Sequence, residues 1–200
     1  DIEEFLKELL KFSEHYNKIA FSKEENNEIN NLLKRINKLE VSVSYPFLLE
    51  VFDDYSEGIL KKDAVIEILK IIESFAFRRI ITDLPTNALN KIFQVLGRDI
   101  KKVENYKENY IEILKYLLIN KKSSQKFPTN QEFSERFKSR DVYNLKSKNR
   151  LHLLETLENY ENKEEVKIEE LLNDKTLNIE HIMPQRLTKN WINSLGQDFH

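Results

Sequence analysis

Apolar residues recur every three or four positions along most of the chain, and lysine and glutamate fill many positions between them. This spacing places apolar side chains on one face of a helix, which indicates amphipathic helices around a shared core. No repeat keeps a constant register, so a compact bundle is favoured over a solenoid. The predicted helices cover residues 2–19, 22–39, 44–57, 62–82, 86–96, 106–120, 129–137, 145–162 and 188–195, with a short helix or turn at 166–174.

Local sequence signals mark several of the predicted helix ends. Ser22 followed by Glu25, and Thr129 followed by Glu132, have the spacing of capping boxes. In a capping box, each of the two side chains bonds the backbone N–H of the other residue at the start of a helix. Glycine commonly ends a helix because it adopts the left-handed conformation without strain. We therefore expect Gly97 to end the helix that precedes it.

The helix predicted at 62–82 is apolar on more than one face, which is typical of a central helix in a bundle. Arg78 and Arg79 lie near its end, where a guanidinium close to the core needs a partner. The carboxylates that could pair with them are Asp53, Asp54 and Glu73. The alternative role for this arginine pair is phosphate binding.

Composition limits the classes of function. Lysine and arginine total 32 against 34 aspartate and glutamate, so the net charge of -2 gives no global sign of a nucleic-acid partner. The absence of cysteine excludes disulfides, thiolate nucleophiles and cysteine-bound zinc, and it fits a reducing compartment. No apolar run is long enough to cross a bilayer, and the acidic first residues differ from a secretory signal. We expect a soluble, cytoplasmic protein without a membrane partner.

Charge is uneven near a polar stretch at 121–126, where we place a domain boundary between residues 122 and 123. Residues 121–150, which we call the basic segment, hold nine Lys/Arg against three Asp/Glu, a balance of +6. Residues 151–174 hold eight acids against two lysines, a balance of -6. The basic segment could follow a phosphate backbone, or it could be the solvated face of two helices. Its candidate DNA contacts are Lys138, Arg140, Lys146, Lys148 and Arg150.

Histidine is the side chain best suited to proton transfer near neutral pH, and the chain has four of them. His15 and His152 lie on predicted amphipathic helices, where we expect positions at the surface or the edge of the core. His181 follows Glu180 within Leu177–Gln185, a short apolar stretch that predicts a strand. This adjacent carboxylate and imidazole form the candidate active site.

Three mechanisms could use such a pair. A thermolysin-like zinc site needs two histidines four residues apart on a helix, and His181 has no such partner. A serine nucleophile of the hydrolase type needs a Gly-x-Ser-x-Gly turn, which does not occur. Metal-assisted hydrolysis of a phosphodiester remains. In it, Glu180 would bind Mg²⁺ or Mn²⁺ and a neutral His181 would accept a proton from the attacking water.

The geometry of a regular strand opposes this arrangement, because neighbouring side chains point to opposite faces. A strand end or bulge near Pro184 would turn Glu180 or His181 towards the other. The alternative is a partly buried His181 that forms a hydrogen bond at a strand end.

The stretch Ile179–Gln185 and the segment Trp191–Gly196 resemble the signature of the HNH-type domains that end GmrSD-type, modification-dependent restriction endonucleases. Residues 151–160 resemble the helix that precedes this signature. Residues 75–80 and 84–93 resemble the helical region between the nuclease domain and the N-terminal domain of the same proteins. The resemblance covers most of the chain, in the expected order.

The resemblance implies a mainly α chain, in which a multi-helix bundle precedes the incomplete start of a ββα-metal domain. Residues 1–122 would be the interdomain bundle, and residues 123–200 the first part of the HNH-like nuclease domain. Glu180 would be the residue on the metal side and His181 the general base. His200 would lie before a Gly-Asn-Leu strand and is not expected to be catalytic. We expect the 200-residue chain alone to be inactive, because that strand and the helix after it are not in the sequence.

The resemblance also implies partners. The substrate would be phage DNA with modified bases, cleaved with Mg²⁺ or Mn²⁺. A ParB-like domain of the same protein would bind nucleotide through an Asp-Gly-Gln-Gln-Arg type motif, which this sequence lacks. The alternative function is a non-catalytic helical scaffold that binds DNA or transmits a signal between domains.

Overall fold

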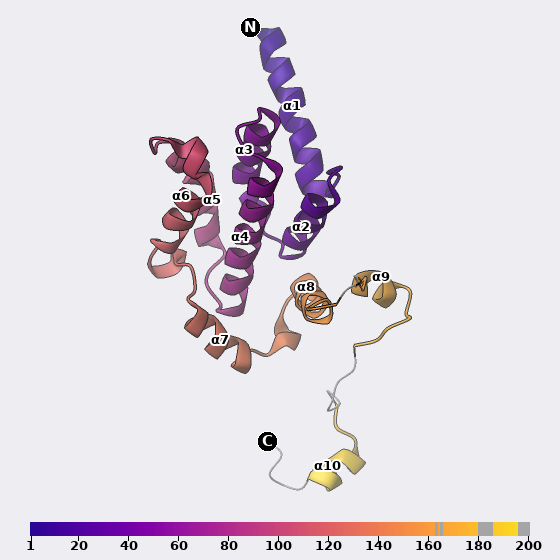
Figure 1. Cartoon of the computed structure of the whole chain (residues 1–200). Coiled ribbons are helices and arrows are strands. Elements are labelled where there is room, and N and C mark those ends of the chain that lie inside the picture. The colour runs from indigo at the N-terminus through magenta and orange to yellow at the C-terminus, as the bar shows by residue number, and fades with distance from the viewer. Residues whose placement is uncertain (163, 165, 180–185, 196–200) are drawn as a thin grey trace. The chain divides into compact units, whose positions relative to one another are not determined.

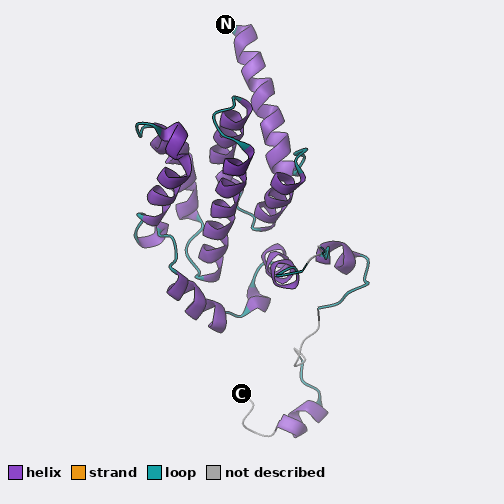
Figure 2. Ribbon diagram, viewed as in Figure 1, coloured by secondary structure: helices purple, strands orange, loops and turns teal. Residues whose placement is uncertain are grey.

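The computed structural model describes residues 1–162, 164, 166–179 and 186–195, and it divides the chain into two compact units, Asp1–Leu153 and Leu154–His200. The described residues form helices joined by turns, with no strand among them (Figures 1 and 2). The helices are α1 Ile2–Phe21, α2 Asn27–Lys38, α3 Tyr45–Ser56, α4 Lys62–Ile81, α5 Asn87–Lys101, α6 Tyr106–Ile119, α7 Asn130–Ser139, α8 Ser147–Glu158, α9 Ile168–Asn173 and α10 Lys189–Leu195. Short 3₁₀ helices occupy η1 Ser42–Ser44, η2 Ser123–Gln125 and η3 Val142–Asn144. The prediction of a mainly helical chain is confirmed.

Helix α4 lies at the centre of the first unit, as its apolar faces predict. It packs against α2, α3, α6 and α7 (Figure 1). Its side chains Ile68, Ile72 and Phe75 are fully buried. Burying a side chain of this size stabilises a fold by about 1.5–3 kcal/mol, so α4 supplies much of the apolar burial that holds the bundle together.

The start of α2 differs from the prediction. Ser22 does not begin a helix but follows the end of α1, in the left-handed conformation with φ of 50°. The cap of α2 is Asn26, whose side-chain oxygen accepts hydrogen bonds from the backbone N–H groups of Glu28 and Ile29. An Asn cap satisfies these N–H groups as well as Ser does. The capping box expected at Ser22 and Glu25 was wrong, because Asn26 caps α2 in place of Ser22.

Gly97 does not end α5, which continues to Lys101. Instead, Gly97 is buried where α3 approaches α5 closely. A Cβ atom at this position would overlap the Glu50 carboxylate, the far end of a flexible side chain. The glycine thus leaves space for the Glu50 carboxylate against α5, which the sequence around it does not reveal.

Arg79 is buried, with 1% of its surface exposed, yet no carboxylate of the described residues pairs with it. Its guanidinium donates hydrogen bonds to the backbone oxygens of Lys126 (3.0 Å), Pro85 (2.8 Å) and Ser124 (2.8 Å). Those carbonyls belong to the loop after α4 and to the polar stretch near η2. The expected ion pair was therefore wrong, and Arg79 instead holds two loops against the end of α4.

The expected acidic partners of Arg79 bind other cations. Asp53 pairs with Lys11, and Asp54 lies 3.2 Å from the Lys101 Nζ. Glu73 binds Arg35 and His152. Among the described residues, no helix is long and apolar enough to span a membrane.

In the second unit, two local contacts organise the described residues after α8. Asn159 closes the loop that follows α8, since its side chain donates to the backbone oxygen of Val166 at 2.9 Å and accepts from the Val166 N–H at 2.6 Å. After α9, the backbone N–H groups of Thr176 and Leu177 both donate to the oxygen of Leu171. The stretch 177–185, which was predicted to be a strand, therefore starts in the turn that ends α9. Its described residues, 177–179, are not in a strand. The start of a ββα domain is not confirmed.

Candidate nucleic-acid interface

Helix α7 docks against the end of α4 through aromatic side chains. The Phe133 ring lies 6.0 Å from the Phe77 ring and 5.5 Å from the Phe137 ring, measured between centroids. The side chains buried in this second apolar cluster are Ile81, Leu145 and Leu153. The cluster joins α7, the turn after it and the first half of α8 to the bundle, so most of the basic segment has a defined place in the first unit.

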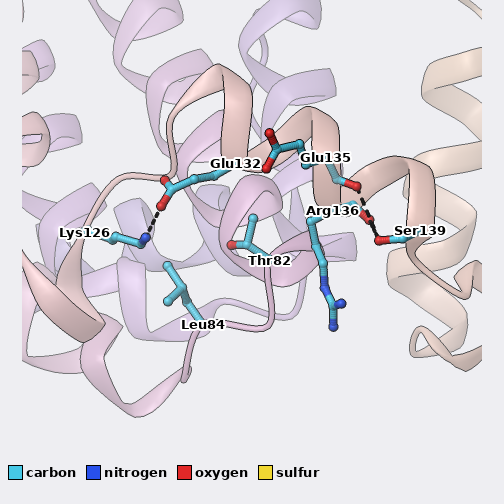
Figure 3. Close-up of a pocket in the computed structure, with 7 residues that line it drawn as sticks. All are labelled: Thr82, Leu84, Lys126, Glu132, Glu135, Arg136 and Ser139. Carbon is cyan, nitrogen blue, oxygen red and sulfur yellow. Dashed lines mark hydrogen bonds and ion pairs between the residues drawn. The ribbon is translucent and has the colours of Figure 1, made fainter.

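The start of α7 has the predicted capping box. The Thr129 hydroxyl accepts from the Glu132 N–H at 3.2 Å, and the Glu132 carboxylate accepts from the Thr129 N–H at 2.9 Å. The same carboxylate pairs with Lys126, which faces it in Figure 3. The pKa of Glu132 is below its usual range because of the hydrogen bond from Lys126 and the one from the Thr129 backbone. The capping prediction for this helix is confirmed.

Two arginines of the basic segment bind one carboxylate in the loop between α4 and α5. Arg136 and Arg140 both pair with Asp83. The hydrogen bond from Arg136, followed by the bond and charge of Arg140, lowers the pKa of Asp83. The Arg140 side chain is only 18% exposed. A contact between Arg140 and DNA would therefore compete with Asp83, and this DNA contact stays a prediction.

A cavity of about 350 Å³ lies beside Arg136. Its lining residues, drawn in Figure 3, are Thr82, Leu84, Lys126, Glu132, Glu135, Arg136 and Ser139. The two cations among them already bind Glu132 and Asp83. Two acids balance two bases in this lining, so the cavity offers no excess positive charge to a phosphate.

Three lysines of the basic segment are better placed to meet a phosphate backbone. Lys138 in the last turn of α7 and Lys148 in the first turn of α8 are exposed, and neither forms an ion pair with any described residue. The Lys146 Nζ lies 3.1 Å from a Glu40 oxygen, but the Lys146 side chain is 73% exposed. An exposed ion pair of this kind contributes at most about 1 kcal/mol, so Lys146 can exchange Glu40 for another anion at small cost.

The structure brings three of the five predicted DNA contacts together at the start of α8. Lys146, Lys148 and Arg150 lie there, and the first turn holds no acidic residue. Arg150 donates to the backbone oxygen of Tyr143 at 2.9 Å, which ties the turn before α8 to the helix. A helix N-terminus carries partial positive charge, so cations there are unfavourable for the helix itself and favourable for a bound anion.

A buried polar contact joins α8 to α2 and α4. The Glu73 carboxylate oxygen lies 2.7 Å from the Arg35 Nε and 2.7 Å from the His152 Nε2. Burial tends to raise the pKa of Glu73, but the hydrogen bond from His152 and the charge of Arg35 hold it below its usual value. His152 is 3% exposed and its ring lies 5.0 Å from the Phe77 ring. His15 is also buried, so neither histidine lies at the surface.

Sequence reasoning missed this contact between Arg35, Glu73 and His152. The available signal was Glu73 itself, a carboxylate on the helix whose faces are mostly apolar. Such a group needs a hydrogen-bonding or charged partner. The sequence does not say which of its 32 lysines and arginines or its histidines would supply one.

Glu180 and His181 lie outside the described residues, as do Pro184 and His200. The predicted metal and proton-transfer roles therefore stay predictions. Among the described residues, no group of three or more His, Cys, Asp or Glu side chains could hold a metal ion.

Comparison with known protein families matches the C-terminal part of the chain. Residues 127–200 match the family of GmrSD restriction endonucleases, C-terminal domain. The matched region begins just before α7 and contains all five predicted DNA contacts, together with Glu180 and His181. No curated protein and no solved structure matches the chain. The match agrees with the resemblance of the C-terminal signature, and it does not extend to residues 1–126.

Proposed function

We propose that the chain is part of an enzyme that hydrolyses phosphodiesters of phage DNA with modified bases, because residues 127–200 match the C-terminal domain of the GmrSD restriction endonucleases. The single observation that carries this proposal is the family match, since it contains the adjacent Glu180 and His181. A DNA substrate follows from the endonuclease family. The modified bases, the cytoplasmic location and a ParB-like nucleotide-binding domain in the same protein are proposed from the resemblance.

In the proposed reaction, Glu180 binds the metal ion and His181 accepts a proton from the water that attacks phosphorus. Mg²⁺ or Mn²⁺, when bound, supplies positive charge that offsets the charge on the phosphate. A carboxylate oxygen is a suitable ligand for either ion. Imidazole is the usual side chain for accepting a proton near neutral pH, which suits His181 to the role of general base.

The described residues have a supporting role in this proposal. The exposed Lys138 and Lys148, with Lys146 beside the α8 N-terminus, contact the phosphate backbone and carry no sequence information. The contact between Glu73 and His152 holds the start of α8 on the bundle. The bundle thereby positions the basic segment, which belongs to the same unit.

Removal of divalent metal is the direct test of the proposed reaction. Nicking of modified phage DNA by the intact protein should stop in excess EDTA and return when Mg²⁺ or Mn²⁺ is added in excess of the chelator. The measurement is conversion of supercoiled to relaxed plasmid or phage DNA on a gel. Cleavage that continues at full rate in EDTA would overturn the metal-dependent mechanism. The control is the same protein in EDTA with Ca²⁺, whose larger radius and more flexible coordination suit it poorly to replace Mg²⁺.

DNA binding by the basic segment predicts a defined salt dependence. Replacement of Lys148 by alanine should weaken binding to DNA of any sequence and reduce the slope of log K against log salt by about 1. The measurement is fluorescence anisotropy of a labelled duplex over a range of NaCl concentrations. Lys34→Ala is the matched control, because Lys34 is an exposed lysine on α2 outside the basic segment. An equal change in DNA affinity and salt slope in both variants would show that the basic segment is a solvated surface and not a DNA contact.

A second candidate function is a non-catalytic helical scaffold that binds DNA or transmits a signal between domains. The observation that favours it is the extent of the bundle, since α1 to α6 lie outside the matched region. DNA binding with a steep salt slope, together with no metal-dependent nicking by the intact protein, would support the scaffold over the nuclease.

A further inference from the structure

A second cavity, of about 550 Å³, lies between α4, α6 and the segment 127–130 that leads into α7. All of its lining residues belong to the first unit. Pockets that hold small organic ligands have volumes of about 300–1,000 Å³, with mainly apolar walls and a few polar groups. The residues that carry the argument are Lys70, Ile71, Arg78, Lys115, Ile119 and Phe127.

One wall of this cavity is aromatic and rests on the core. The Phe127 ring packs against the Phe75 ring with centroids 5.0 Å apart, and Phe75 is fully buried. Ile71 is half-buried beside it, whereas Ile119 on α6 is 68% exposed. A supported ring of this kind can stack against a flat ligand group, and base–aromatic stacking contributes about 1–3 kcal/mol per base.

The charged side chains that line the cavity are all cations. Two of them are lysines with exposed partners outside the lining. The Lys70 Nζ lies 3.9 Å from a Glu28 oxygen, and the Lys115 Nζ lies 3.3 Å from Glu67 and 3.5 Å from Glu112. Exposed pairs of this kind contribute at most about 1 kcal/mol. A ligand anion can therefore take either ammonium group without a large loss of stability.

The third cation, Arg78, is fixed in place before any ligand arrives. Its guanidinium donates to the Pro128 oxygen at 3.2 Å and to the Asn130 side-chain oxygen at 2.7 Å. It also lies over two rings, 5.8 Å from the centroid of Phe127 and 5.2 Å from that of Phe133. A guanidinium has five N–H donors, and these two bonds leave others for a phosphate oxygen.

We propose that this cavity binds one nucleotide, with the base against Phe127 and the phosphate among Arg78, Lys70 and Lys115. The aromatic wall matches a heterocycle, and the three cations match a phosphate. Such a nucleotide can come from a free mononucleotide or from an unpaired position in a DNA strand. The second source rests on the proposed function in DNA cleavage, and it would make the cavity a contact for DNA outside the proposed Glu180–His181 site.

The test is a titration of the 200-residue chain with deoxyadenosine monophosphate, without divalent metal, followed by NMR of ¹³C-labelled isoleucine methyl groups. The methyl signals of Ile71 and Ile119 should shift and saturate. Those of Ile19 and Ile36, buried in the core outside this cavity, should not. Deoxyadenosine without phosphate should bind about tenfold more weakly, which is the loss of about 1.4 kcal/mol expected without the phosphate contacts. No saturable shift at Ile71 would overturn the proposal.

Two substitutions on α6 provide a matched pair. Ile119 and Tyr116 are 68% and 67% exposed, but only Ile119 lines the cavity. Ile119→Glu should weaken nucleotide binding about tenfold, because it places a carboxylate beside the phosphate. Tyr116→Glu adds the same charge outside the lining and should change the affinity by less than about twofold, since solvent and salt screen an exposed charge. Equal weakening in both variants would contradict a site in this cavity.

Further titrations separate the two sources. A DNA duplex with one unpaired adenine that shifts Ile71, beside a fully paired duplex that does not, identifies the DNA strand as the source. A shift with the mononucleotide alone identifies a free nucleotide. A shift only with an acidic aromatic peptide overturns the proposal in favour of a protein partner. This binding is measured without metal or cleavage, so its failure is distinct from failure of the nuclease assignment.

Discussion

Replacement of His181 by alanine is expected to lower the rate of metal-dependent DNA nicking by about 10²- to 10⁴-fold, the usual contribution of a general base. Alanine cannot accept the proton of the attacking water, and hydroxide from solution must then replace the activated nucleophile. The rate should be measured with the intact protein at saturating Mg²⁺, under single-turnover conditions. Binding of DNA, measured by anisotropy, should change little, because His181 acts on the proton and the basic segment binds the phosphates.

His200→Ala is the control for this experiment, since His200 is the nearest other histidine in the sequence and has no proposed role. It should nick DNA at close to the rate of the unaltered protein. A further check is the pH profile, because a rate that depends on solution hydroxide should keep rising with pH and lose the plateau that a general base produces. Nicking by His181→Ala at an unchanged rate would exclude the assigned role.

Replacement of Glu73 by alanine is expected to destabilise the first unit by about 1–3 kcal/mol, the usual cost of leaving a buried polar group such as His152 without its hydrogen-bond partner. The substitution removes the carboxylate that both Arg35 and His152 contact. Urea unfolding followed by circular dichroism measures the change in the free energy of unfolding. Glu67→Ala is the matched control on the same helix, because the Glu67 side chain is 45% exposed and its pair with Lys115 should contribute less than about 1 kcal/mol.

The same carboxylate predicts a dependence of stability on pH. The pKa of Glu73 is lower in the folded chain than its ordinary value of 4.5. A carboxyl group with a lowered pKa contributes stability above the ordinary pKa, and this contribution is lost as the pH falls through the folded value. The difference in unfolding free energy between the unaltered chain and Glu73→Gln should therefore be at its full value at pH 6 and shrink as the pH falls below 4.5. A difference that stays constant with pH would contradict the ionised state of Glu73.

Features that depend on neighbouring residues were predicted well from the sequence. The central position of α4 follows from its apolar faces, and the capping box of α7 follows from Thr129 and Glu132 three residues apart. Where local signals competed, prediction failed. Ser22 was the predicted cap, and the structure uses Asn26, a residue type that also caps helices. Gly97 resembles a helix end, but it lies inside α5, where the carboxylate of Glu50 from α3 comes close to it.

The candidate site was predictable only in part. Its family could be inferred from Glu180, His181 and the residues around them, and the match to residues 127–200 agrees with that family. The chemistry assigned to Glu180 and His181 stays a prediction. A strand was expected from Leu177 onwards, but Leu177 lies in the turn that follows α9. The geometry that would bring a carboxylate and an imidazole to one metal ion stays a prediction, because both side chains lie outside the described residues.

Periodicity and capping determine helices because the responsible hydrogen bonds and side-chain contacts join residues within about four positions of each other. The sequence therefore contained the helical framework and the signature of an endonuclease domain. Only the tertiary structure decided the partners of the buried charged groups. Arg79 meets backbone oxygens up to 47 residues away, and Glu73 meets His152 at a distance of 79 residues in the chain. Many residues could serve as such partners, and packing selects among them because a buried charge is tolerated only where the fold supplies its hydrogen bonds.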